Sequence, residues 1–82
     1  MTLSKYEWGG THTDNYAGRL HVLRTILNKD GYTSAGTYFG VGKPLYHVCD
    51  DDQFYVDYYI RAIDRHDALR QVRLHYPNAK VG

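Results

Sequence analysis

Hydrophobic residues alternate with polar ones along residues 53–63, and this alternation is the clearest structural signal in the chain. Side chains of a β-strand point in turn to its two faces, so every second residue shares a face. One face of the predicted strand is apolar and comprises Phe54, Val56, Tyr58, Ile60 and Ala62. The other face mixes aromatic, charged and aliphatic groups, namely Tyr55, Asp57, Tyr59, Arg61 and Ile63. We therefore expect the first face in the core and the second at the boundary with water.

A helix is predicted directly after this strand, because the hydrophobic period changes at Asp64. The Asp64 carboxylate can cap the helix by accepting a hydrogen bond from the free backbone amide of Asp67. One stripe of the predicted helix is suited to pack on a sheet, and it comprises Ala68, Leu69, Val72, His75 and Tyr76. Pro77 cannot continue a helix, so the chain should turn there toward a short last strand at 79–81.

Two earlier strands are predicted, at residues 19–28 and 45–49. The first carries apolar groups on both faces, which favours a strand, although Leu20, Leu23 and Leu27 also satisfy helical spacing. Together these elements predict an α+β fold in which a small antiparallel sheet has one helix packed on one face, roughly in the order β-β-β-α-β.

The chain should form a single domain over residues 1–82. Residues 1–18 show no sustained period and are rich in Thr, Gly, Asn and Asp, which indicates a loose N-terminal arm on an α+β body of residues 19–82. Trp8 is a candidate to anchor this arm on the body or on a partner, whereas complete disorder of the arm is the alternative.

Residues 31–43 contain four glycines and form the least regular stretch of the chain. A loop of this length is usually functional or mobile, but Tyr38 and Phe39 could instead form a short strand flanked by glycines. No nucleotide-binding motif is present. Gly42 and Lys43 are followed by Pro44 instead of Ser or Thr, and the dinucleotide pattern lacks its third glycine.

Composition limits the classes of function. The formal charge of +1 gives no global field that would attract nucleic acid or a membrane. A single cysteine, Cys49, excludes an internal disulfide and fits a reducing compartment. No apolar run approaches the roughly 20 residues that a membrane span needs. We therefore expect a cytoplasmic protein, in which homo-oligomerisation could supplement a small core.

Metal and cysteine chemistry are both weakly indicated. His47, Cys49 and Asp50–Asp52 are metal-ligand types, and His12 and Asp14 could add to them, but no zinc spacing is completed. Cys49 would need a base and an orienting partner to act as a nucleophile, and no local signature supplies them. We expect a buried, inert thiol, no metal, no cofactor and no enzymatic activity.

Two surfaces are candidates for binding. The first is an acidic turn with neighbouring aromatic residues: Asp50, Asp51, Asp52, Tyr55 and Tyr59. Nine tyrosines outnumber two phenylalanines and one tryptophan, and tyrosine suits interfaces because its ring is apolar and its tip polar. The alternative surface would bind nucleic acid through His66, Arg70 and Arg73 on the solvent side of the helix, or through tyrosines on an open sheet face.

Three segments resemble small phage- or prophage-borne proteins of undefined role. They are the Tyr-Phe-Gly-x-Gly-x-Pro-Leu-Tyr stretch at 38–46, Ile-Arg-Ala-x-Asp-Arg-x-x-Ala at 60–68, and Tyr-Pro-Asn-Ala at 76–79. Many proteins of that kind inhibit host machinery, anti-CRISPR proteins among them. The resemblance implies a non-enzymatic inhibitor or adaptor that binds a host protein or protein–nucleic-acid complex in the bacterial cytoplasm. It assigns no role to any single residue.

Overall fold

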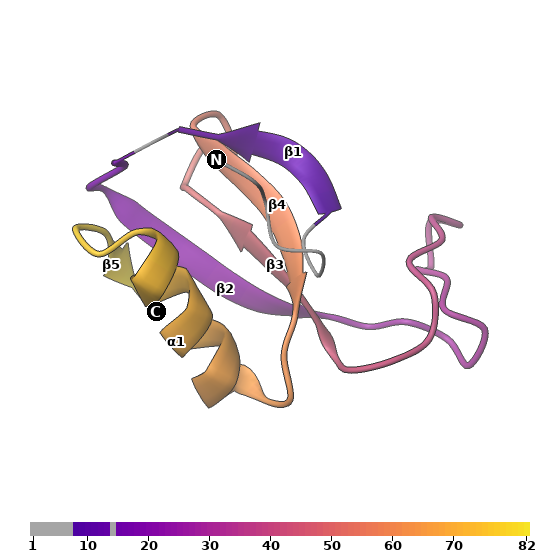
Figure 1. Ribbon diagram of the computed structural model, residues 1–82. Helices are drawn as coiled ribbons and strands as arrows, with labels where there is room; N and C mark the ends of the chain where they lie inside the picture. Colours follow the sequence, from indigo (N-terminus) through magenta and orange to yellow (C-terminus); the bar gives the residue numbers. More distant parts are fainter. Residues whose placement is uncertain (1–7, 14) are drawn as a thin grey trace.

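The computed structural model describes residues 8–13 and 15–82, which form one sheet and one helix (Figure 1). The elements follow the chain in this order: β1 (Trp8–His12), β2 (Arg19–Thr25), β3 (Leu45–Cys49), β4 (Val56–Arg61), α1 (Arg65–His75) and β5 (Lys80–Val81). The strands are arranged in the sheet as β1-β4-β3-β2-β5. The predicted α+β class, with one helix between the strand-rich part and a short last strand, is confirmed.

Two features of the sheet differ from the prediction. β5 runs parallel to β2, so the sheet is mixed, although its other three pairings are antiparallel. Residues 8–12 were assigned to a loose arm, but they form β1 and pair with β4. The register between these strands shifts between Trp8 and Thr11, where Gly9 and Gly10 lie. Glycines weaken a strand pattern, so the alternation of hydrophobic residues did not indicate β1.

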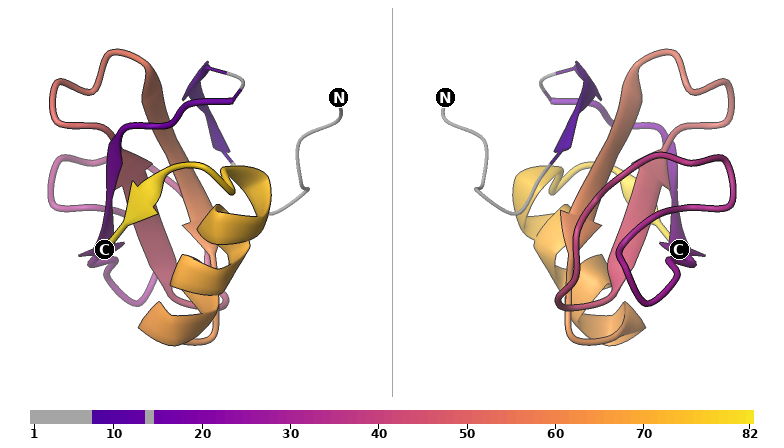
Figure 2. Two further views of the ribbon diagram at one scale, coloured as in Figure 1. Left: turned by 90° about the vertical axis from the view of Figure 1, so that its left-hand side faces the viewer. Right: turned by 90° about the vertical axis from the view of Figure 1, so that its right-hand side faces the viewer.

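The core lies between the sheet and α1, which packs across one face (Figure 2). Val56, Tyr58, Ile60 and Ala62 are each at most 2% exposed, as the alternation predicted. The helix contributes the predicted stripe, in which Ala68, Val72 and Tyr76 are at most 1% exposed, and Leu69 packs against the same cluster. β2 and β3 complete the core with Leu20, Val22, Tyr46 and Val48.

The predicted strand at 53–63 was too long, and the error changes two assignments. β4 begins at Val56, so Phe54 lies outside the sheet and is 68% exposed instead of buried. At the other end Arg61 was assigned to the solvent face, yet it is only 7% exposed. The predicted strand at 19–28 is likewise a strand but ends at Thr25.

The connection between β2 and β3 projects from the sheet on the side away from α1 (Figure 1). Tyr32 and Tyr38 form one isolated bridge within it, and Phe39 and Gly40 donate backbone hydrogen bonds to the carbonyl of Gly31. This stretch is therefore a folded loop, and the alternative of a regular strand at Tyr38 and Phe39 is not observed.

One edge of β2 is completed in an unusual way. β5 pairs with it only at Arg19 and Leu20, and Gly82 donates its amide to the Leu20 carbonyl. Two residues further along the same edge, the Val22 carbonyl accepts a hydrogen bond from the Arg65 guanidinium at the start of α1. The Arg65 side chain thus pairs with the edge of β2 beyond the end of β5.

No helix in the described part of the chain is long and apolar enough to cross a bilayer.

The predicted helix cap is present: Asp64 is the N-cap and accepts from the Asp67 amide at 2.8 Å. We expect Asp64→Ala to lower the free energy of unfolding by about 1 kcal/mol, because one helix amide loses its partner. In a domain of this size that loss corresponds to a decrease in Tm of about 4–8 °C, measurable by circular dichroism. Asp64→Ser keeps a capping oxygen and serves as the control. An unchanged Tm in the alanine variant would contradict the assignment.

Candidate functional site

The three acids of the predicted binding tip have different roles. Asp50 is 3% exposed, and its Oδ1 accepts hydrogen bonds from the backbone amides of Phe54 at 2.9 Å and of Tyr55 and Val56 at 3.2 Å. Asp50 therefore holds the turn between β3 and β4 together and is removed from the predicted contact surface. Asp51 and Asp52 are exposed, as expected.

The environment of Asp50 keeps its carboxyl group ionised. Burial alone would raise its pKa, but the hydrogen bonds from the amides of Val56, Phe54 and Tyr55 outweigh this effect and lower the pKa below its usual value. Because these amides donate to the charged form, the ionised carboxylate holds the backbone of the turn in one conformation.

The turn that Asp50 holds together exposes two aromatic rings. Gln53 donates its amide to the Asp50 carbonyl at 3.1 Å and has a left-handed φ of 54°, which is uncommon for a residue with a side chain. The next two residues, Phe54 and Tyr55, are 68% and 47% exposed. The sequence signal for this arrangement was available, since an Asp that opens a polar run commonly bonds to the backbone of its own turn.

The exposed rings form a small cluster beside the two exposed acids. Phe54 and Tyr55 meet edge to face with ring centroids 4.9 Å apart, and Tyr16 stacks on Tyr55 at 5.9 Å. We name the group of Asp51, Asp52, Phe54 and Tyr55 the acidic–aromatic turn. Its four side chains come from five consecutive residues, and Tyr16 supports them from the segment before β2.

Tyr59 does not belong to this turn. It lies in the middle of β4 on the sheet face opposite α1, where His47 stacks on it at 4.6 Å and Phe39 approaches at 4.7 Å. Burial, Asp57 and Cys49 raise the pKa of its hydroxyl. The structure thus places Tyr59, half-buried between His47 and Phe39, outside the acidic–aromatic turn with which it was predicted to act.

The same sheet face carries two histidines that are paired with acids. His47 pairs with Asp57 at 2.5 Å, and His21 pairs with Asp51. Cys49 is 4% exposed, and burial together with the charge of Asp57 raises the pKa of its thiol, so the thiolate is disfavoured. Among the described residues no three His, Cys, Asp or Glu side chains gather as metal ligands. Asp14 lies outside those residues.

The helix residues of the alternative prediction are exposed, and an acid is paired with one of them. His66, Arg70 and Arg73 all face solvent. Arg70, however, donates to Asp67 at 2.7 Å, and this acid offsets its charge. Arg73 forms no ion pair with a described residue. One unpaired arginine gives only a weak electrostatic field for a phosphate backbone.

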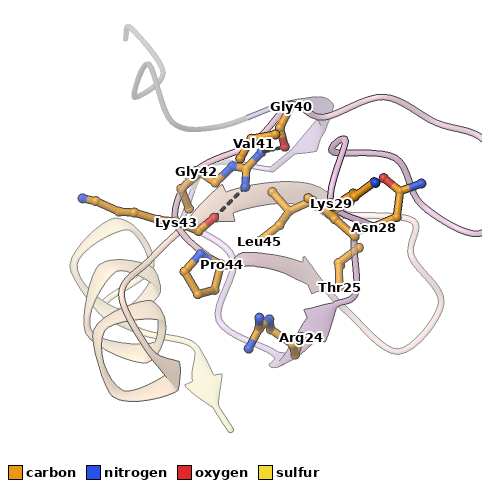
Figure 3. Close-up of a pocket in the computed structure, with 12 residues that line it drawn as sticks. Arg24, Thr25, Asn28, Lys29, Gly40, Val41, Gly42, Lys43, Pro44 and Leu45 are labelled. Carbon is orange, nitrogen blue, oxygen red and sulfur yellow. Dashed lines mark hydrogen bonds between the residues drawn. The ribbon is translucent and has the colours of Figure 1, made fainter.

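Sequence reasoning missed the role of Arg61. Its guanidinium donates to the carbonyl of Lys43 at 2.5 Å and to those of Phe39 and Gly40 at 2.8 Å, and so ties the glycine-rich loop to β4. Burial lowers the pKa of Arg61, although a guanidinium remains charged in proteins. Beside it lies an open pocket of about 200 Å³ (Figure 3).

Comparisons of the chain with models of protein families, with curated proteins and with solved structures give no match.

The ionised state of Asp50 leads to a pH-dependent prediction. Its pKa is lower in the folded than in the unfolded chain, so its stabilising contribution is present above the unfolded value of about 3.9 and is lost as the pH falls through the folded value. Asp50→Asn should lower the free energy of unfolding near neutral pH by about 1–3 kcal/mol. Urea titrations should show this gap between the two proteins shrinking as the pH falls to about 3. Asp52→Asn is the exposed control and should change stability by less than about 0.5 kcal/mol.

The anchoring role of Arg61 predicts a local loss of order. Arg61→Lys keeps the charge but not the planar fork that reaches three carbonyls. We expect a loss of stability of about 1.5–3 kcal/mol. Hydrogen exchange at the amides of Phe39 and Gly40 should become faster than in the native protein, and this increase should exceed that at the amides of β3. Arg70→Lys is the matched control on α1. Equal protection of the Phe39 amide in Arg61→Lys and in the native protein would rule out the anchor.

Proposed function

We propose that the chain is a small non-enzymatic binding protein whose acidic–aromatic turn occupies a basic site on another protein. The observation that carries this proposal is the exposure of Phe54, 68%, on a turn held rigid by a buried carboxylate. Isolated exposed apolar side chains are common and need no explanation. Phe54 differs because the backbone on both sides of it is fixed and a second exposed ring lies against it.

Rigid presentation favours binding. An aromatic ring buries roughly 150–250 Å² when it enters a partner's pocket. The ordering cost that usually offsets such a gain is small here, because Asp50 already fixes the amides of Phe54 and Tyr55. Aromatic anchors of this kind are frequent among the residues that dominate interface energies.

The charge beside the rings suggests the nature of the partner. Asp51 and Asp52 are exposed and three residues or fewer from Phe54. A negative tip speeds encounter with a positive surface and disfavours acidic partners. The resemblance to phage-borne inhibitors would make that surface part of a bacterial host complex in the cytoplasm, and inhibition would follow from occupation of the site, without a cofactor.

The test compares capture by the native protein with capture by a variant of the turn. Immobilised protein should retain a host protein from a bacterial lysate even after nuclease treatment. The triple variant Asp51→Asn, Asp52→Asn, Phe54→Ser should lose that protein, and the affinity measured with the purified partner should fall at least tenfold, as for loss of one interface anchor.

The control variant places matched changes elsewhere. Asp30→Asn with Leu74→Ser removes an exposed acid and an exposed apolar side chain far from the turn. Both variants should melt like the native protein. Retention of the same host protein by the triple variant, with unchanged affinity and salt dependence, would refute the proposal.

A further inference from the structure

The pocket beside the glycine-rich loop carries positive charge on its walls. Arg24, Lys29, Lys43 and Arg61 line it, and none of its described lining residues is acidic. In Figure 3, Arg24 and Thr25 lie on the β2 side and Gly40 to Gly42 on the other, while the Lys43 side chain leads away from both. The basic residues in the pocket wall are Arg24, Lys29, Lys43 and Arg61, of which Arg61 is already bonded to three loop carbonyls.

Backbone donors add to this charge. Within the described part of the chain the amides of Val41 and Gly42 take part in no hydrogen bond, although Gly40 before them donates to Gly31. Both residues line the pocket. Successive free amides beside basic side chains are the groups that bind phosphate oxygens in proteins. The chain reaches this arrangement without a recognised nucleotide-binding motif.

A second, more apolar pocket of about 260 Å³ adjoins the first, and Leu27 and Asn28 line both. Tyr32 forms part of its wall. Tyr38 lies 4.9 Å from Tyr32 between ring centroids and is 61% exposed. Exposed tyrosine rings next to a positive pocket combine the two elements that hold a nucleotide: a site for its phosphate and a surface for its base.

We propose that this loop binds nucleotide units, with a phosphate in the basic pocket and a base stacked on Tyr32 or Tyr38. The inference is independent of the proposed protein-binding turn, because the two sites share no residue and lie at opposite ends of β3. It also differs from binding through the helix, since His66, Arg70 and Arg73 line neither pocket.

The experiment uses the full chain and a fluorescein-labelled 15-nucleotide thymidine strand, followed by fluorescence anisotropy at several salt concentrations. The double variant Arg24→Gln, Lys29→Gln should weaken binding at least tenfold. It should also reduce the slope of log K against log salt by about 1.4, the loss of two phosphate contacts to a single strand. Tyr38→Ala should weaken binding at least fivefold with little change in that slope.

Two controls separate this site from other surfaces. Arg73→Gln on α1 and Tyr55→Ala on the acidic–aromatic turn should bind like the native chain. Arg24 lies over the Tyr46 ring at 6.0 Å, so its replacement could disturb folding. Amide chemical shifts of the native protein therefore provide a second measurement, and the signals of Val41 and Gly42 should move when the strand is added.

Thymidine monophosphate distinguishes the source of the nucleotide. Affinity for the strand at least tenfold above that for the monophosphate identifies single-stranded nucleic acid, whereas equal affinities identify a free nucleotide, and either result supports the site. Absence of binding to both at low salt would overturn it. Weakening by Arg73→Gln as large as by the pocket variants, or unmoved signals of Val41 and Gly42, would overturn it equally.

Discussion

A sheet has two faces, and the described part of the chain supplies one helix to cover them. α1 covers the face that carries Val56, Tyr58 and Ile60, so the opposite face has to be closed by other means. The chain does this with stacked rings and paired charges along β3 and β4, and with the loop that Arg61 draws against the sheet. A buried guanidinium is costly unless its donors are satisfied, and three loop carbonyls satisfy them here. The shape of the loop, the cover over Tyr59 and the basic pocket all depend on this contact.

The parts of the fold that sequence reasoning predicted are those governed by local rules. The capping role of Asp64 and the burial of Val72 follow from helix geometry, and the buried face of β4 follows from alternation. β1 was missed because Gly9 and Gly10 break its pattern. The parallel pairing of β5 depends on where the chain returns after α1, which no local pattern encodes.

The candidate site was predicted less well, for a related reason. The acidic run and Tyr55 were correctly placed near one another, but the predicted strand began three residues too early and assigned Phe54 to the core. Asp50 was grouped with its neighbours by composition, although its place at the start of the polar run indicated a bond to the backbone of its own turn. Arg61 gave no signal at all, because its partners lie 18 to 22 residues away in the chain.

Charge is separated along the sheet. The acidic–aromatic turn follows the end of β3, and the basic pocket lies beside its start, about 17 Å away for a strand of five residues. The Debye length at physiological salt is about 8 Å, so each end presents its own field despite a formal charge of +1. One small domain can thus present surfaces of opposite charge, and the near-neutral total conceals this polarity.

The contact between Arg65 and the Val22 carbonyl has a consequence for how copies of the chain meet. β5 covers only Arg19 and Leu20 of the β2 edge, and an uncovered strand edge is a template for pairing with another molecule. The Arg65 guanidinium donates a hydrogen bond to the Val22 carbonyl, the next carbonyl on that edge, and places a positive charge there. Two approaching copies would have to displace this group and bring two like charges together before their strands could join. A single side chain at the start of the helix thus leaves the Val22 carbonyl unavailable to a strand of a second copy.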